Sequence, residues 1–383
     1  MDCEPSVISS DDDPATGDCL ETPLVMGGTL LAINAVCTDP DITALGSRRH
    51  VVMVPATPAT DLLWLHLGGT GGRPLNTTKL GLAALSEGYR YISLAYPSEP
   101  SIAARCTCEG LGPRPLGCEE LARTEVLTGE DASPWLDMEP DEAIIPRLTA
   151  LLTSLHAQQP GGGWDAYIDD EGAPEWALLA VSGFSQGGGM AGLIARDHRV
   201  DRALYFSKGR GSALEAMADP STYQSCDATK PCEGDVGCCP FDDLSCGSPP
   251  EEGGLCAVQV PDPWTDTGLD TDGDYRGEGT AVLQLTPPER QLAIVHIDEG
   301  AWDYSPEVFS VWGMGERSDY LDAGSSQGPY SPDEQLFTLD LPPNPAADCS
   351  THQSMGADAC MADHPDTGQP AMLPVWLHAM TLP

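Results

Sequence analysis

Short apolar runs alternate with helical stretches along the chain from about residue 28 onward. This alternation is typical of strands joined by helical crossovers. The middle runs are apolar over most of their length, as expected of strands that helices cover on both faces. The pattern therefore predicts an α/β protein with a mostly parallel, doubly wound sheet. The expected strands are residues 29–36, 49–56, 62–67, 89–97, 176–185, 202–209, 291–298 and 335–341.

Helices are predicted over residues 141–158, 186–198 and 374–380. In the first, leucine and isoleucine recur at helical spacing, and Pro146 falls in the first turn, where proline is tolerated. The second is rich in small residues and follows the fifth expected strand directly. The third closes the chain.

Two stretches interrupt this order. Residues 98–140 and residues 214–289 carry cysteines and show no sustained periodicity. We interpret both as disulfide-stapled insertions in one domain of residues 26–383, and the larger as a candidate lid. Residues 1–25 are acidic and rich in Ser and Pro, which predicts a disordered leader.

The charge balance narrows the classes of partner. The chain has 18 Lys+Arg against 59 Asp+Glu, a net charge of −41. Such a surface repels phosphate backbones and anionic lipids, so nucleic acids and membrane surfaces are not expected as partners. The sequence also lacks a run of roughly 18 apolar residues, the length that a membrane-spanning helix needs.

The 14 cysteines favour disulfides over zinc, because no CxxC spacing occurs. Disulfides imply an oxidising compartment, so we expect a secreted or periplasmic protein. The first residues carry no signal peptide, which suggests that the signal is not in this sequence. The pairing cannot be deduced, although Cys349–Cys360 is a natural local bridge.

The pentapeptide Gly183-Phe184-Ser185-Gln186-Gly187 joins the fifth expected strand to the helix after it. Glycines two residues before and after a serine are typical of the strained strand–turn–helix bend that exposes a nucleophile. The helix N-terminus would also face developing negative charge. Ser185 is therefore the predicted nucleophile.

An acyl-transfer serine needs donors for an oxyanion. One would be the backbone N–H of Gln186, the residue after the nucleophile. The other would come from the glycine-rich stretch 66–72, HLGGTGG, where Gly69 or Thr70 is the expected donor. A phosphate-binding loop is the alternative, but no lysine follows as in a P-loop.

The expected order along the chain is serine, then acid, then histidine. His352 follows the last strand and lies between Cys349 and Cys360, where a bridge would fix it within reach of Ser185. His364, four residues past Cys360, is the less constrained competitor.

The acid should follow the strand predicted over residues 291–298. Asp298 ends that strand, and Asp303 lies in the loop beyond it. A carboxylate a few residues past the strand favours Asp303 over Asp298, and Glu299 is a poorer third candidate.

With these residues in view, the chain resembles the esterase/lipase-type α/β hydrolases, and more closely a sparsely characterised bacterial branch of them. LHLGGTGGRP, GYRYISLAYP, WALLAVSGFSQGGGMAGLIAR, VDRALYFSKG and the late His352 with VWLHAM carry the likeness over most of residues 60–380. GFSQGGG is also similar to the GYSQG of cutinases. The resemblance implies an α/β-hydrolase fold, a triad of Ser185, His352 and one late Asp, and hydrolysis of a carboxylic ester.

A second candidate site is the acidic stretch that contains Asp266, Asp270, Asp272 and Asp274. Alternate carboxylates can bind Ca²⁺, but position 12 counted from Asp270 is Ala281, where an EF-hand needs Glu. A flexible acidic linker is the favoured interpretation.

The sequence thus predicts a secreted serine esterase that needs no cofactor and acts on a small-molecule or polymer ester. A lipase or polyester depolymerase with the same triad is the alternative within enzymes. A non-catalytic binding protein on the same scaffold is the alternative outside them.

Overall fold

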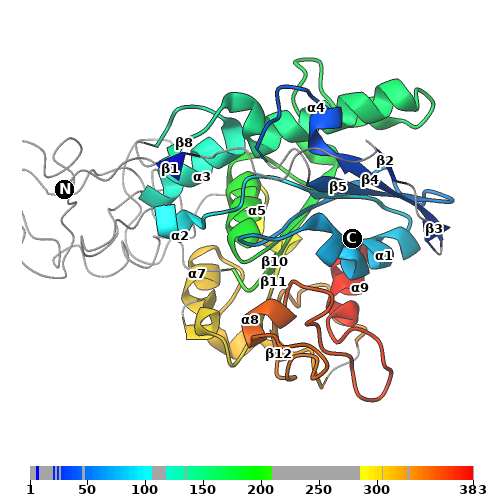
Figure 1. Ribbon diagram of the computed structural model, residues 1–383. Coiled ribbons are helices and arrows are strands. Elements are labelled where there is room, and N and C mark those ends of the chain that lie inside the picture. The colour runs from blue at the N-terminus through cyan, green and yellow to red at the C-terminus, as the bar shows by residue number, and fades with distance from the viewer. Residues whose placement is uncertain are drawn as a thin grey trace, which may run out of the picture.

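The computed structural model describes residues 6–7, 20–21, 24–25, 27–44, 48–105, 118–133, 136–208, 285–303, 305–325 and 328–382 (Figure 1). Its larger strands are β4 (Gly28–Asn34), β5 (Arg49–Pro55), β6 (Leu63–Leu67), β7 (Arg90–Leu94), β9 (Leu179–Phe184), β10 (Arg202–Phe206), β11 (Gln291–His296) and β13 (Leu336–Leu339). Its α-helices include α1 (Thr78–Ser86), α2 (Ile102–Arg105), α3 (Cys118–Thr128), α4 (Ile144–Gln158), α5 (Gln186–Asp197), α7 (Ser305–Val311), α8 (Thr351–Ser354) and α9 (Leu373–Thr381).

Three short strands, β2 (Leu20–Glu21), β3 (Leu24–Val25) and β12 (Leu321–Asp322), join the larger ones in one 11-stranded sheet. Its order is β12-β13-β11-β10-β9-β6-β7-β5-β4-β2, with β3 paired to β4. From β7 to β12 (Leu321–Asp322) every neighbouring pair is parallel, whereas β5 runs antiparallel to both β4 and β7. β7 comes between β6 and β9 in the sequence, but in the sheet β6 pairs with β7 on one side and with β9 on the other. β6 therefore lies in the middle of the sheet. This order is that of the α/β-hydrolase fold, so the predicted fold class is confirmed.

Helices cover both faces of the sheet. Leu63, Leu65 and Leu67 of β6 face a core shared with α3, α4, α5 and α7, whereas Trp64 faces a core shared with α1 and α9. Figure 1 shows α4 on one side of the sheet and α1 with α9 on the other. The central strands are therefore buried on both faces, which explains why they read as continuous apolar runs.

A buried ion pair ties the segment after β4 to α4. Arg147 is fully buried, and its guanidinium pairs with the Glu142 carboxylate and donates to the backbone oxygen of Ala44. The other Glu142 oxygen accepts the backbone N–H of Thr43 at 2.5 Å and of Ala44 at 2.6 Å. Each charge thus has a partner, and backbone groups use the remaining hydrogen-bonding capacity of the pair.

The described part of the first insertion has more regular structure than its sequence pattern indicates. Residues 98–140 contain α2, α3 and the short strand β8 (Leu136–Asp137). Helix α3 contacts α4 and α5, so it is packed into the domain. Buried polar side chains on α3, among them Glu119, Arg123 and Glu125, interrupt the apolar period that would have marked this helix.

The other domain boundaries stay predictions. Within residues 1–25, the pairs Ser6–Val7, Leu20–Glu21 and Leu24–Val25 form the short strands β1, β2 and β3. Almost all of the second insertion, residues 214–289, lies outside the described residues. Among the helices that are described, none is long and apolar enough to cross a membrane.

Candidate active site

Ser185 stands at a strained bend between β9 and α5. Its backbone has φ 54° and ψ −115°, a conformation that residues other than glycine rarely adopt. A Cβ at Gly183 would lie 2.0 Å from the carbonyl oxygen of Gly187, and one at Gly187 would lie 2.0 Å from that of Leu67. Only glycine fits at either position, so the two glycines of the pentapeptide are required for the close approach of strand, turn and helix.

The turn after β6 lies beside the start of α5. The N–H of Gly72 donates to the carbonyl oxygen of Gly69 at 2.8 Å, which closes the turn. Thr70 Oγ1 donates to Gln186 Oε1 at 3.1 Å, and the same oxygen accepts the N–H of Ile102 at 2.9 Å. The Gln186 side chain therefore joins the segments that carry all three predicted oxyanion donors, a role for this side chain that the sequence did not indicate.

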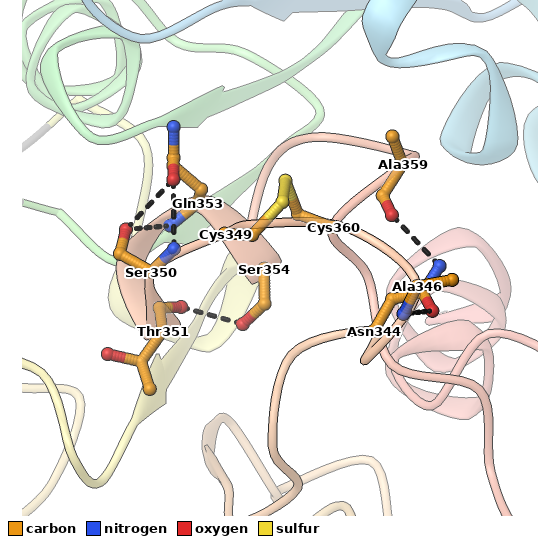
Figure 2. Close-up of a disulfide and its surroundings, with 9 residues drawn as sticks. All are labelled: Asn344, Ala346, Cys349, Ser350, Thr351, Gln353, Ser354, Ala359 and Cys360. Carbon is orange, nitrogen blue, oxygen red and sulfur yellow. Dashed lines mark hydrogen bonds between the residues drawn. A yellow bond between two sulfur atoms is a disulfide. The ribbon is translucent and has the colours of Figure 1, made fainter.

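His352 lies on α8, a single helical turn with strong local restraints. Ser350 and Gln353 form a capping box at its start, and the Cys349–Cys360 disulfide, with Cα atoms 5.6 Å apart, closes the segment around it (Figure 2). The predicted local bridge is thereby confirmed. Cys37 is also disulfide-bonded. A capped and crosslinked turn restricts the positions open to the imidazole.

The imidazole of His352 joins the serine to a carboxylate. Nε2 lies 2.8 Å from Ser185 Oγ, and Nδ1 lies 2.5 Å from Glu299 Oε2. The Glu299 side chain is 2 % exposed, whereas that of His352 is 40 % exposed. Serine, histidine and carboxylate thus form one line of hydrogen bonds, with the carboxylate shielded from water and the imidazole open to it.

Glu299 is held on its other oxygen as well. Glu299 Oε1 accepts a hydrogen bond from Ser207 Oγ and another from the N–H of His296 at 3.0 Å. Ser207 is fully buried and has a φ of 42°, a second strained non-glycine residue near the site. Ser207 was not singled out from the sequence, and no local motif marks it.

The structure places a different carboxylate beside His352 from the one that the sequence predicts. Glu299 occupies the position beside His352 Nδ1 that Asp303 was expected to fill, with Asp298 as its alternative. The reason is the end of β11, which comes at His296 and not at Asp298, so the third residue past the strand is Glu299. The chain then turns back, with the Glu299 N–H on the His296 carbonyl oxygen. Asp298 is exposed, and Asp303 ends the short 3₁₀ helix Gly300–Asp303.

Asp358 fixes the segment after His352 to the start of α1. Its Oδ2 accepts the N–H of Thr78 at 2.6 Å and the Thr78 hydroxyl at 2.7 Å, and its carboxylate also accepts the N–H of Lys79. Its own N–H donates to the carbonyl oxygen of Asn76. Because α1 follows the glycine-rich turn, this contact joins the histidine segment to the expected oxyanion segment.

The remaining predicted residues do not join the site or lie outside the described chain. His364 is buried and its Nδ1 accepts the N–H of Asp366. The calcium candidates Asp266, Asp270, Asp272 and Asp274 lie outside the described residues. In the part of the chain that is described, no three His, Cys, Asp or Glu side chains are grouped to hold a metal ion.

His66, the first residue of the glycine-rich stretch, points into the sheet core. It is 2 % exposed, and its Nδ1 lies 2.9 Å from Ser182 Oγ. Ser182 Oγ also accepts the Trp64 indole N–H at 2.8 Å and donates to the Leu65 carbonyl oxygen at 3.4 Å. Burial lowers the pKa of His66 to about 3, which keeps the ring neutral at ordinary pH.

We expect the free energy of unfolding to fall as pH falls from 6.5 toward 3, because His66 binds a proton in the unfolded chain but not in the folded one. The unfolded-state pKa is near 6.5 and the folded one near 3, so below pH 6.5 the unfolded chain binds more protons. The contribution of neutral His66 to the free energy of unfolding is complete above pH 6.5. Below that pH it declines by about 1.4 kcal/mol per pH unit. Urea unfolding at pH 7, 5.5 and 4.5 measures the total slope, to which His50 also contributes because burial lowers its pKa to about 3 as well.

His66→Asn is the matched variant, because the asparagine amide can form a hydrogen bond with Ser182 but does not titrate in this range. The difference in unfolding free energy between wild type and variant should shrink as pH falls. A difference that is constant from pH 7 to 4.5 would show that His66 does not titrate on unfolding.

No protein-family model and no curated protein matches the sequence. Among solved structures, the chain is similar to an S-formylglutathione hydrolase from Agrobacterium tumefaciens, at 12% identity over 96% of this chain and 100% of that one, with a TM-score of 0.39. An esterase of the bacterial hormone-sensitive lipase family is 14% identical over 94% and 86%, with a TM-score of 0.37. At these identities and scores, the likeness carries no argument about activity.

Proposed function

We propose that this protein is a serine hydrolase that cleaves carboxylic esters through an acyl-enzyme on Ser185. The observation that carries the proposal is the unbroken line of hydrogen bonds from Glu299 through His352 to Ser185 Oγ, at a strained bend. A serine hydroxyl becomes a nucleophile when an adjacent base removes its proton and a third group orients that base. These three side chains provide that arrangement.

In the proposed reaction, Ser185 Oγ attacks the ester carbonyl carbon while His352 Nε2 takes the hydroxyl proton. Glu299 accepts the Nδ1 proton of His352 in a hydrogen bond, which selects the productive tautomer and stabilises the imidazolium. The imidazolium then gives its proton to the leaving alcohol. Water, deprotonated by His352, attacks the acyl-enzyme, and the acid is released as Ser185 regains its proton.

The oxyanion of each tetrahedral intermediate needs preorganised donors. Gln186 begins α5, so its N–H belongs to the first helical turn, where amides have no partner within the helix. Gly69 and Thr70 lie in the adjacent turn, and Thr70 is hydrogen-bonded to the Gln186 side chain. The Gln186 amide with an amide of Gly69 or Thr70 would then hold the negative charge.

We also propose that the protein acts outside the reducing cytosol, and that no cofactor takes part. The bridge around His352 supports the first point, because such a crosslink persists in oxidising compartments. The triad supports the second, since acyl transfer by serine needs only protein groups. A lipase or a polyester depolymerase would use the same residues, and hydrolysis of p-nitrophenyl esters of increasing chain length separates these from a short-chain esterase.

Labelling with a fluorophosphonate tests the central claim. The native protein should form a covalent adduct, and fragmentation of the labelled peptide should place it on Ser185. Ser182 is an internal control, because it is three residues away and fully buried. A native protein that does not label, or an adduct elsewhere than Ser185, would contradict the proposed function and favour a non-catalytic binding protein.

A further inference from the structure

Phe184, the residue before the nucleophile, contacts three separate parts of the site. Its ring centroid lies 4.8 Å from that of His352, with the two planes tilted by 37°. A Cβ at Gly356 would lie 2.1 Å from Phe184 Cγ, and a Cβ at Gly69 would lie 2.9 Å from its Cδ1. The ring therefore fills the space between the imidazole, the segment after it and the glycine-rich turn.

The two glycines are explained by this ring and not by their backbone conformation. Neither Gly69 nor Gly356 has a positive φ, so a side chain would be allowed at both positions if the space were empty. Any Cβ would instead displace the Phe184 ring. The ring thus sets how closely the base segment and the oxyanion segment approach the nucleophile.

The contact matters because His352 is partly open to solvent. Hydrogen bonds fix its two nitrogens but leave the ring free to tilt about the line that joins them, and 40 % of the side chain is exposed. An aromatic ring against one face limits that tilt. The same face attracts a cation, and the imidazole becomes one when it removes the serine proton.

We propose that Phe184 is a positioning residue, whose ring fixes the plane of the His352 imidazole and its spacing from the Gly69 turn during acyl transfer. This inference rests on the proposed serine hydrolase function. Misplacement of a reacting group by about 1 Å can cost roughly 100-fold in rate. Loss of the ring should therefore act on the chemical step and not on substrate binding.

The test compares Phe184→Leu with Phe184→Tyr, using p-nitrophenyl acetate and the rate of fluorophosphonate labelling. Phe184→Leu keeps an apolar side chain but loses the ring, so kcat should fall roughly 10- to 100-fold while KM changes little. Phe184→Tyr keeps the ring and should recover most of the lost rate. Labelling of Ser185 should slow in the same order.

Phe337→Leu is the matched control, because Phe337 is a buried ring of the same core. Its recorded ring contacts are with Tyr330 and His378, neither of which belongs to the triad. It should lose stability and keep kcat. If the wild type labels and Phe184→Leu keeps the wild-type kcat, this inference is overturned while the proposed function stands. Failure of wild type to label would overturn the proposed function and this inference with it. If Phe184→Leu is poorly folded, Gly356→Ala, which displaces the ring, provides the same comparison.

Discussion

Glu299→Gln is expected to lower kcat for p-nitrophenyl acetate by about 10⁴, with the fold intact. The substitution changes one atom: the glutamine oxygen still accepts from Ser207 and from the His296 N–H, while its amide nitrogen faces His352 Nδ1. An N–H at that position favours the tautomer whose proton is on Nε2. That tautomer cannot take the proton from Ser185.

Asp303→Asn and Asp298→Asn are the matched controls for this assignment. Each removes one carboxylate within four residues of Glu299, and each should stay within a few-fold of the wild-type kcat. Ser185→Ala defines the background rate against which all three are measured. If Asp303→Asn lost as much activity as Glu299→Gln, or if Glu299→Gln retained activity, Glu299 would not be the acid of the triad.

Arg147→Ala is expected to destabilise the fold by about 3–5 kcal/mol. It leaves the Glu142 carboxylate buried at 2 % exposure without its counter-ion and also removes donors from the backbone oxygens of Ala44 and Glu142. Such a loss is a large fraction of the free energy of unfolding of an ordinary domain. Urea unfolding at pH 7 with the disulfides intact measures it.

Arg290→Ala is the control for loss of an arginine at the surface. The Arg290 side chain is 36 % exposed, and its contact to Asp201 is 3.2 Å, so the expected loss is no more than about 1 kcal/mol. Equal losses for the two variants would mean that burial adds nothing to the Arg147 pair. An Arg147→Ala/Glu142→Gln double variant should lose less than the sum of its single variants, since each single change leaves one charge unpaired.

The sheet could be predicted from the sequence because its strands are buried on both faces and bounded by turn residues. The strained bend at Ser185 could be predicted because its conformation imposes glycines at 183 and 187, a local requirement that short sequence patterns record. The position of His352 beside Ser185 could be predicted because the order along the chain and the flanking cysteines restrict the choice. In these cases the physical constraint acts over a few neighbouring residues.

The carboxylate beside His352 could not be predicted because its position depends on the residue at which β11 ends. The predicted strand extended two residues past the actual end of β11, so the acid was expected in the loop beyond Asp298 and not at Glu299. Ser207 contacts Glu299 and Phe184 contacts His352, each far away in the sequence, and nothing in their local pattern indicates those contacts. Helix α3 could not be predicted either, because buried charged residues stand where the helical repeat of apolar residues would otherwise appear.

The cap that Asp358 places on α1 has a consequence for the time order of folding. The two partners are 280 residues apart, and closing a loop of that length costs about 5 kcal/mol of chain entropy. The first turn of α1 therefore stays incomplete in a chain still emerging from the ribosome. During synthesis Ser185 is made long before His352 and Glu299, so under the proposed function a nascent chain carries the serine without its base. The contact between Asp358 and α1, which connects the segment of His352 to the glycine-rich turn, can form only after the last quarter of the chain has been made.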